Sequence, residues 1–302
     1  MASIRTYYTD WRDFGFRYVW EYWFLGRLHG KKYKHAAVTH YLQRFYEQNP
    51  AAKDIQYSVT PNPYPDSIWV CWWQGEEQMP EVVKICYASL KAHANGHPVR
   101  LITKDNYMQY VKMPEWVVRK FDAGAITITH FSDLLRLTLL SRYGGLWMDA
   151  TLFLTGDLPK ETPAFFTLKQ KAKDNEYVSA YRWSGYCMGG NNVNPIFTQA
   201  YNMLVGYWAK HERIINYYIL DYIYDLLYQS NEKIKNMIDR NLDNNPNVMY
   251  LAEHLNQPIN KMEWERVCEN TSIFKLSWKQ KYCAKTNDNK QTFWSHLIEN
   301  QK

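Results

Sequence analysis

The fold is decided by the stretch Phe131-Ser-Asp-Leu-Leu-Arg-Leu-Thr-Leu-Leu-Ser-Arg-Tyr-Gly-Gly-Leu-Trp-Met-Asp-Ala-Thr151. Its leucine-rich first part predicts a compact helix, with Ser132 as the N-cap. The Tyr143-Gly144-Gly145 turn ends this helix, because glycine accepts the left-handed backbone of a helix C-terminus. The apolar run at 146–154 predicts a buried strand. A helix that returns through a tight turn into a strand indicates an α/β sheet protein.

Three charged side chains of this stretch can converge on one ligand. Asp133 and Arg136 are three residues apart, so on a helix they share a face, and the strand then presents Asp149. Each feature also has an ordinary interpretation: a local helix ion pair, a helix C-cap and a turn acid. Asp149, however, is embedded in apolar sequence, and a carboxylate in a buried strand needs a partner to offset its desolvation. We therefore expect a functional site, in which Asp149 can hold a hard divalent cation beside substrate phosphates.

The flanking sequence alternates strand-like and helical segments, as an α/β fold requires. Short apolar or β-branched runs predict strands, and apolar residues at helical spacing predict helices. In chain order these are a strand at 68–73, a helix at 81–94, a strand at 99–103, a helix at 116–121, strands at 125–129, 164–168 and 177–180, and helices at 195–210 and 213–228. The Tyr and Trp residues of the last two helices predict core packing, because they recur at helical spacing.

Composition divides the chain into three parts. Residues 1–60 are aromatic and basic, with nine Lys and Arg against five Asp and Glu, and predict an N-terminal helical region. Residues 61–67 contain the Pro61-Asn-Pro-Tyr-Pro65 cluster, which predicts an extended linker. Residues 68–302 are expected to form the α/β domain, with a helical C-terminal part.

Aromatic residues make up 17% of the 302 residues. Rings with polar tips suit sugar sites, nucleobase platforms and membrane interfaces. From Trp11 to Phe45 the rings are mixed with Arg and Lys, as in helices that lie on anionic bilayers. An aromatic helix packed on the domain with a solvated basic face explains this segment equally well. A nucleic-acid binder is the weakest interpretation, because beyond this segment the basic residues are not patterned with the rings.

Targeting and cysteine signals favour a cytoplasmic location. Residues 1–10 lack the apolar region of a secretory signal, and no stretch reaches the roughly 18 apolar residues of a spanning helix. The five cysteines are widely spaced and form no Cys-x-x-Cys pair, so neither a zinc site nor a disulfide framework is expected. If the N-terminal segment contacts lipid, we expect peripheral association with the inner face of the plasma membrane.

The central stretch resembles the D-x-D region of sugar transferases with a GT-A fold, particularly glycosyltransferase family 32 and its capsular polysaccharide synthesis relatives. The Ser-Asp-hydrophobic-hydrophobic-Arg helix, the Tyr-Gly-Gly turn and the strand acid follow that pattern in order. The similarity extends over residues 68–159, where 68–75 resembles the opening strand, 101–107 a following strand and turn, and 152–158 the segment after the motif. The resemblance implies a Rossmann-like, nucleotide-sugar-binding α/β domain with added N-terminal and C-terminal helices.

The resemblance also implies roles for individual residues. Asp133 and Arg136 would contact the ribose or sugar of a UDP-sugar donor, and Trp72 would stack near the base. Asp149 would bind Mn²⁺ or Mg²⁺ beneath the diphosphate and, with Arg136, would be catalytic. The motif departs from D-x-D, because Thr151 stands where the second acid is expected. Thr151 offers only a neutral oxygen or a water-mediated contact, so metal affinity would be weaker, or another residue would complete the shell.

Four further residues complete the set of candidates. His254 resembles a late-chain histidine of the capsular relatives and is a candidate metal ligand, although an isolated histidine is more often structural. Gly145, in the turn, is a candidate for substrate contact. Asn191 and Asn192 follow a Gly-Gly pair and would contact donor or acceptor through their amides. A turn that uses Gly and Asn to reach positive φ explains them at least as well.

The resemblance implies a metal-dependent, retaining glycosyltransferase. The enzyme would move a hexose from a nucleotide sugar to a lipid-linked or oligosaccharide acceptor in capsule or exopolysaccharide synthesis. Stabilisation of the diphosphate by the metal and Arg136 would be the main catalytic contribution, followed by positioning of the two sugars. The alternative is a non-catalytic, membrane-associated protein of the same fold, which binds a sugar nucleotide or glycan and has lost the second metal acid.

Overall fold

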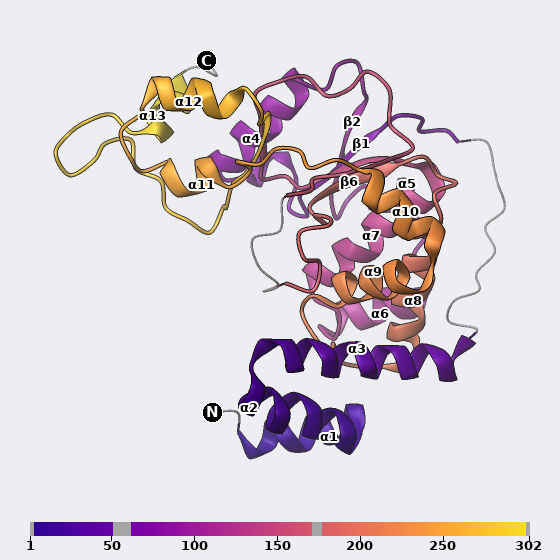
Figure 1. Cartoon of the computed structure of the whole chain (residues 1–302). Coiled ribbons are helices and arrows are strands. Elements are labelled where there is room, and N and C mark those ends of the chain that lie inside the picture. The colour runs from indigo at the N-terminus through magenta and orange to yellow at the C-terminus, as the bar shows by residue number, and fades with distance from the viewer. Residues whose placement is uncertain (1–2, 51–61, 171–176, 300–302) are drawn as a thin grey trace.

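The computed structural model describes residues 3–50, 62–170 and 177–299 and contains a five-stranded sheet (Figure 1). The strand order is β2-β1-β3-β6-β5. β1 pairs parallel with both β2 and β3, whereas the β3–β6 and β6–β5 pairs are antiparallel. The α/β class predicted from the alternating pattern is confirmed. The strands are β1 (Ile68–Cys71), β2 (Val99–Ile102), β3 (Gly145–Met148), β5 (Phe165–Thr167) and β6 (Cys187–Gly190).

Helices surround the sheet and dominate both ends of the chain (Figure 1). A short 3₁₀ turn at Glu76–Gln78 follows β1, and a π-helical turn at Trp20–Leu25 joins the first two helices. The helices are α1 (Ile4–Val19), α2 (Gly26–His29), α3 (Lys31–Gln48), α4 (Glu81–Ala92), α5 (Tyr107–Tyr110), α6 (Glu115–Asp122), α7 (Ile128–Tyr143), α8 (Pro195–Lys210), α9 (Ile219–Ser230), α10 (Glu232–Arg240), α11 (Tyr250–His254), α12 (Lys261–Cys268) and α13 (Phe293–Glu299).

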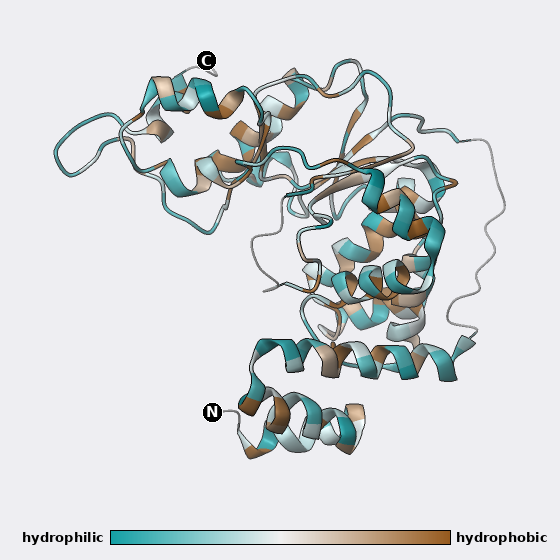
Figure 2. Cartoon of the chain, viewed as in Figure 1, coloured by the Kyte–Doolittle hydropathy of each residue, from teal (hydrophilic) through white to brown (hydrophobic). Residues whose placement is uncertain are grey.

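The central strands separate two hydrophobic clusters. Trp69 of β1 and Trp147 of β3 pack with α7, α8 and α9, whereas Val70 and Met148 pack with α4 and the C-terminal elements. Successive side chains of a strand point to opposite faces, so this alternation buries both faces of the sheet. Figure 2 shows the hydrophobic residues concentrated in the strands and in the helices beside them, while the N-terminal helices mix hydrophobic and hydrophilic positions.

The run at 146–154, predicted as one strand, forms parts of two different sheets. After β3 the chain turns at Asp149, whose N–H donates to the carbonyl of Tyr186 over 2.9 Å. β4 (Leu152–Leu154) then pairs antiparallel with β7 (Ile273–Lys275) in a separate two-stranded sheet. The single-strand prediction was wrong because an apolar run does not reveal a turn within it. This turn carries the residues of the altered D-x-D motif.

α7 begins earlier than predicted. Its N-cap is Thr127, whose side chain accepts a hydrogen bond from the backbone N–H of His130. The predicted cap, Ser132, lies inside the helix and donates to the carbonyl of Thr129. The strand predicted at 125–129 was wrong, because β-branched residues favour strands only where packing agrees, and here the Thr127 cap starts a helix.

Three later predictions are also settled by the described residues. Residues 177–180 form a turn instead of a strand, with Ala180 at a φ of 45°. The helix predicted from 213 begins only at 219, as α9. The predicted linker continues through 62–67 without helix or strand, while Pro61 lies outside the described residues. The division of the chain into domains at 61–67 stays a prediction.

The N-terminal helices pack on the α/β core. α3 lies against α9 (Figure 1), and Phe14, Tyr18 and Leu42 are buried in the same cluster as α7, α8 and α9. The Tyr46 hydroxyl donates to the carbonyl of Met203 over 2.8 Å. The packed helix proposed as one explanation of this segment is therefore present. No helix among the described residues is long and apolar enough to cross a membrane.

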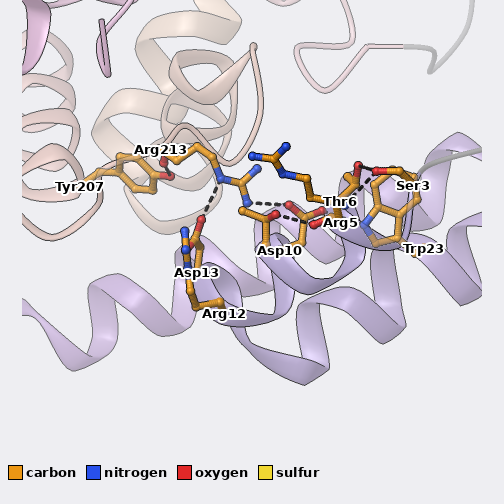
Figure 3. Close-up of polar contacts among 10 residues, drawn as sticks. Ser3, Arg5, Thr6, Asp10, Arg12, Asp13, Trp23, Tyr207 and Arg213 are labelled. Atoms are coloured by element: carbon orange, nitrogen blue, oxygen red, sulfur yellow. Dashed lines mark hydrogen bonds and ion pairs between the residues drawn. The ribbon is translucent and has the colours of Figure 1, made fainter. Parts of the chain in front are cut away.

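An ion-pair clamp also holds α1 to the core (Figure 3). Arg213, in the loop after α8, donates to Asp10 over 2.7 Å and to Asp13 over 2.8 Å. Asp10 is buried and also accepts a hydrogen bond from Trp23. Burial raises the pKa of Asp13, but hydrogen bonds from Arg12 and Arg213 outweigh it and hold the pKa below its ordinary value. The clamp fixes the N-terminal helices beside α9.

Candidate functional site

A cavity of about 670 Å³ lies where β1 and β3 end. We call it the Asp149 cavity. Open α/β sheets bind ligands at the carboxyl ends of their parallel strands, which is the edge where this cavity opens. The described residues that line it include Trp72, Asp149 and Thr151, and from β7 and the segment after it Lys275 and Lys279. The predicted strand acid therefore lies in a hollow large enough for a ligand.

Asp149 is surrounded by donors. Its Oδ1 accepts a hydrogen bond from Trp147 over 3.0 Å and lies 4.0 Å from Nη2 of Arg136. Its Oδ2 accepts a hydrogen bond from Nζ of Lys275 over 2.8 Å. Burial raises the pKa of Asp149, but the charges of Lys275 and Arg136 outweigh it and hold the pKa below its ordinary value. Asp149 is therefore ionised at neutral pH, and its charge attracts the side chains of Lys275 and Arg136 beside the cavity.

Asp133 and Arg136 share a face of α7, as their spacing predicts, and they form the local ion pair given as the ordinary interpretation of that spacing. Oδ1 of Asp133 lies 3.3 Å from Nη2 of Arg136, and both side chains are buried. The guanidinium lies 5.0 Å from the ring centre of Trp147, and its Nε has no hydrogen-bond partner among the described residues. Burial raises the pKa of Asp133 to about 6, although Arg136 opposes this shift. Arg136 does not line the Asp149 cavity, so its buried guanidinium acts there through its charge beside Asp149.

Lys275, which the sequence analysis did not select, bridges the two residues of the altered D-x-D motif. Its ammonium donates to Asp149 and to the hydroxyl of Thr151, each over 2.8 Å. The β4–β7 register places Lys275 opposite Leu152, so the small sheet fixes its position. Lys275 and Asp149 are 126 residues apart in the chain. No local pattern around Lys275 signals the contact, which depends on strand pairing.

Trp72 lies in the wall of the Asp149 cavity. Its indole N–H donates to the carbonyl of Gln78 over 3.3 Å. Its ring meets Trp278 edge to face, with centroids 5.9 Å apart and planes at 88°. Trp278 is about half exposed. Rings arranged in this way offer aromatic faces on which a planar base can stack.

Gly145 lies at the opposite end of β3 from Asp149. It pairs with Gly190 at the start of the strand, and four residues of extended chain span about 13 Å. Its φ is 87°, and a Cβ there would collide with the carbonyl oxygen of Ser67. Gly145 is therefore required for the close approach of β1 and β3, and the geometry does not support the predicted substrate contact.

Asn191, Asn192 and His254 are not brought to the Asp149 cavity in the described structure. The two asparagines follow β6 at the same far end of the sheet as the glycine turn, and Asn192 donates to the carbonyl of Arg142 over 3.2 Å. His254, in α11, stacks on Tyr250 with centroids 4.1 Å apart, and its Nδ1 lies 2.8 Å from the carbonyl oxygen of Tyr250. The stacking of His254 fits a structural role, whereas neither Asn191 nor Asn192 has the positive φ of the alternative explanation, which only Gly190 shows in this turn. The roles of all three residues as ligands stay predictions.

A second cavity of about 560 Å³ lies between the N-terminal helices and α9. We call it the Tyr217 cavity, because Tyr217 lines both cavities. Its described walls include Lys34, Tyr218 and Asp221. Burial raises the pKa of Asp221 to about 6, opposed by a hydrogen bond of 2.9 Å from the indole of Trp183. Sequence analysis missed Asp221, because it stands in a Tyr-rich helix whose spacing predicts core packing.

The donor set around Asp149 does not fit an ordinary divalent-metal site. Mn²⁺ and Mg²⁺ are hard cations, and a site that also binds substrate phosphates commonly holds them through one or two protein carboxylates. Within residues 3–50, 62–170 and 177–299, no group of three or more His, Cys, Asp or Glu side chains is arranged to hold a metal ion. Asp149 and Thr151 supply one carboxylate and one hydroxyl, and both already accept from Lys275. The described structure thus places an ammonium on the two side chains through which the altered motif would hold a metal.

The sequence matches one family model over most of its length. That model, described as "Capsular polysaccharide synthesis protein", matches residues 20–297. No curated protein matches the chain. One similar solved structure, titled "PaToxG Glycosyltransferase", has a TM-score of 0.41 and 14% identity, over 68% of this chain and 84% of the other. Another, a WbbM bifunctional glycosyltransferase in its apo form, has a TM-score of 0.41 and 12% identity, over 82% and 51%.

Proposed function

The chain belongs to the capsular polysaccharide synthesis protein family, and from this premise we propose that it is a GT-A-like glycosyltransferase. It would move a hexose from a nucleotide sugar, UDP-linked as the sequence resemblance implies, to a saccharide acceptor in capsule or exopolysaccharide assembly. The family match confirms the resemblance to capsular polysaccharide synthesis proteins. The donor, the acceptor and the retaining mechanism belong to the proposal.

The proposal is supported mainly by the aromatic rings and the cationic side chains that line the Asp149 cavity together. Trp72 and Trp278 supply aromatic faces for the base. Lys275 and Lys279 line the same cavity and supply positive charge for the diphosphate. Arg136, behind the wall, adds a buried guanidinium with an unused donor. A nucleoside diphosphate is the class of ligand that uses both kinds of contact.

Positive charge at the diphosphate supplies the chemistry of transfer. The bond between the anomeric carbon and the diphosphate oxygen breaks, and its electron pair leaves with the nucleotide. The acceptor hydroxyl forms the new bond to the anomeric carbon. Retention, which the resemblance implies, requires attack on the face from which the diphosphate departs, where the leaving oxygen can take the hydroxyl proton. Lys275 and Arg136 stabilise the charge that develops on the leaving group, which is generally the largest catalytic contribution.

The acceptor saccharide would occupy the Tyr217 cavity. The two cavities share one lining residue, Tyr217, and this adjacency supports the assignment of the acceptor. Tyr217 and Tyr218 offer rings on which sugar faces can pack. Lys34, from α3, offers a cation for an anionic acceptor group, such as the phosphate of a lipid-linked saccharide. The N-terminal helices would then form one wall of the acceptor site.

Hydrolysis of nucleotide sugars tests the proposed activity. We expect the purified protein to hydrolyse at least one of a panel of UDP-hexoses, and Asp149→Asn to lower kcat/KM at least about 100-fold, because Lys275 loses its charged anchor. The matched control is Asp157→Asn, since the Asp157 side chain is 64% exposed and does not line the cavity. Full activity in Asp149→Asn would contradict the assignment of Asp149. Binding of UDP without any turnover would favour the non-catalytic alternative, and failure of UDP to bind would contradict the proposed donor site.

Peripheral membrane contact is a further part of the proposal. Residues 4, 8 and 11 share one face of α1 by their spacing, and exposed apolar side chains continue at 16, through the π-helical turn at Trp20–Leu25, and at 28 in α2. Four arginines of α1 and α2 are interspersed with them, a pattern that suits anionic headgroups of the inner plasma-membrane leaflet. These side chains, which we call the aromatic surface, are 47–88% exposed: Ile4, Tyr8, Trp11, Phe16, Trp20, Phe24 and Leu28.

Co-sedimentation with vesicles tests the membrane contact. We expect the full chain to sediment with vesicles that contain phosphatidylglycerol, and much less with pure phosphatidylcholine. A variant with Trp11, Phe16 and Trp20 changed to Ser should stay in the supernatant. The control changes Leu242 and Met262 to Ser, which are 82% and 81% exposed but lie outside the aromatic surface. A wild-type chain that does not sediment, or a triple variant that sediments equally well, would contradict the proposal.

A further inference from the structure

We propose that the ammonium of Lys275 takes the place of the divalent cation, so that the donor diphosphate binds without a metal. This inference rests on the proposed function, because it concerns how the Asp149 cavity holds a nucleoside diphosphate. It replaces the metal expected from the D-x-D resemblance with a residue of β7. The consequence is a donor site whose affinity does not depend on Mn²⁺ or Mg²⁺.

Lys275 occupies the position that a motif-bound metal would take. Its Nζ is 2.8 Å from Oδ2 of Asp149 and 2.8 Å from Oγ1 of Thr151, the two side chains that begin and end the altered motif. A magnesium ion would approach both oxygens to about 2.1 Å and would therefore stand beside the ammonium, which repels it. The ammonium and a metal ion compete for one place.

The structure holds Lys275 in this place from several sides. β7 pairs with β4, which directly follows the motif turn, so the lysine and its two oxygen partners belong to one local unit. The ammonium lies 5.0 Å from the ring centre of Tyr186, within range of a cation–π contact. The side chain is only 21% exposed. Lys275 is therefore a positioned charge and not a mobile surface lysine.

The side chains that line the cavity carry a net positive charge without a metal, as a site for a diphosphate requires. Among the described residues that line the cavity, Asp149 is the acid, whereas Lys275 and Lys279 are both cationic. The buried Arg136 lies 4.0 Å from Asp149, but its charge is offset by Asp133, whose Oδ1 is 3.3 Å from the same guanidinium. The lysine ammonium has three donors. Two of them bind Asp149 and Thr151, which leaves one for a phosphate oxygen.

Calorimetry with UDP tests the inference directly. We expect the wild-type protein to bind UDP with the same Kd, within about twofold, in EDTA, Mn²⁺ or Mg²⁺. Lys275→Met should weaken UDP binding in EDTA at least about tenfold, because a hydrogen bond between charged groups is lost. Lys275→Arg should retain part of the affinity. The matched control, Lys281→Met, changes an exposed lysine outside the cavity lining and should bind UDP as the wild type does.

A converse variant keeps the test informative if Lys275→Met folds poorly. Combining Thr151→Asp with Lys275→Ala restores two acids at the motif and removes the competing ammonium. We expect this double variant to bind Mn²⁺, seen by calorimetry with Mn²⁺ alone, and to bind UDP only when Mn²⁺ is present. Thermal denaturation of each variant verifies the fold.

The outcomes separate this inference from the proposed function. Wild-type UDP binding that requires Mn²⁺ or Mg²⁺ would overturn the role of Lys275 and leave the glycosyltransferase proposal standing. Unchanged UDP affinity in folded Lys275→Met, or a double variant that binds UDP equally well in EDTA, would also overturn it. Failure of the wild type to bind UDP under any of these conditions would overturn both.

Discussion

Replacing Asp221 with Asn should stabilise the protein at neutral pH, although most substitutions of buried residues destabilise. Burial raises the pKa of Asp221 from 3.8 to about 6, so the folded state disfavours the ionised form. A difference of about two pKa units corresponds to about 3 kcal/mol at pH 7.5. Asn keeps an oxygen that accepts the hydrogen bond from the indole of Trp183. The substitution therefore removes the buried charge and retains its partner.

The expected gain depends on pH in a defined direction. Between about pH 4 and pH 6 the folded state binds more protons at Asp221 than the unfolded state, so wild-type stability falls as the pH rises through this window. The destabilisation is complete above about pH 7, about half as large at pH 5 and absent below about pH 3. Because Asp221 lines a cavity, screening reduces the full effect to about 1–3 kcal/mol.

Urea denaturation, followed by tryptophan fluorescence, measures this effect. We expect Asp221→Asn to be more stable than the wild type by about 1–3 kcal/mol at pH 7.5, with a clearly smaller gain at pH 5.0. Asp105→Asn, at an exposed position, is the matched control and should show no gain at either pH. A less stable Asp221→Asn variant at pH 7.5, or an equal gain at both pH values, would refute the reasoning. A buried acid that persists despite its effect on stability is expected at a functional site.

Three further predictions concern the turn, the clamp and the acid on α7. Gly145→Ala should lower the free energy of unfolding by more than about 2 kcal/mol, since its Cβ meets a backbone carbonyl. Gly124→Ala, with a φ of 76° but nothing within 4 Å, should lose only about 1 kcal/mol in the same thermal denaturation. Arg213→Met should lower the free energy of unfolding by about 1–3 kcal/mol, because Asp10 loses its ion pair. It should also speed proteolysis of α1, and an unchanged rate of proteolysis would contradict the role of the clamp. Burial raises the pKa of Asp133 to about 6, so the rate of UDP-hexose hydrolysis should fall as the pH drops below about 6. If the rate of Asp133→Asn falls over the same acidic range, protonation of Asp133 is not the cause of the loss.

The site residues that could be predicted from the sequence are close to one another along the chain. Asp133 and Arg136 share a helix face, and the glycine turn brings Asp149 back toward them within one helix–turn–strand unit. The shared face of Asp133 and Arg136 and the approach of Asp149 to Arg136 were therefore predictable from spacing. The same reasoning failed at 146–154, where it predicted a single strand. The residues stay buried through the turn that joins the two sheets, so the apolar pattern shows no break there.

The residues that sequence analysis missed come together only through tertiary pairing. Lys275 reaches Asp149 because β7 pairs with β4. Asp221 lies beside Arg136 and Asp133 closely enough that their charges shift its pKa, yet its neighbours in sequence are core residues of α9. The spacing of residues in a single sequence does not predict either contact. The residues around Lys275 and Asp221 do not distinguish them from an ordinary exposed lysine and an ordinary exposed acid on a helix.

The Asp-Ala-Thr sequence, which stands in place of D-x-D, indicates a weakened metal site when it is considered alone and an intact donor site when Lys275 is considered with it. From the sequence alone, the loss of the second acid indicates weaker metal binding or a decayed site. With Lys275 placed on Asp149 and Thr151, the charges balance again: two carboxylates with one divalent cation are neutral, and so are one carboxylate and one ammonium. At this partly buried site, the single carboxylate without the ammonium, or the ammonium beside two carboxylates and a metal, would leave an unbalanced charge. The altered motif is therefore expected of a working donor site that uses its own side chain as the cation.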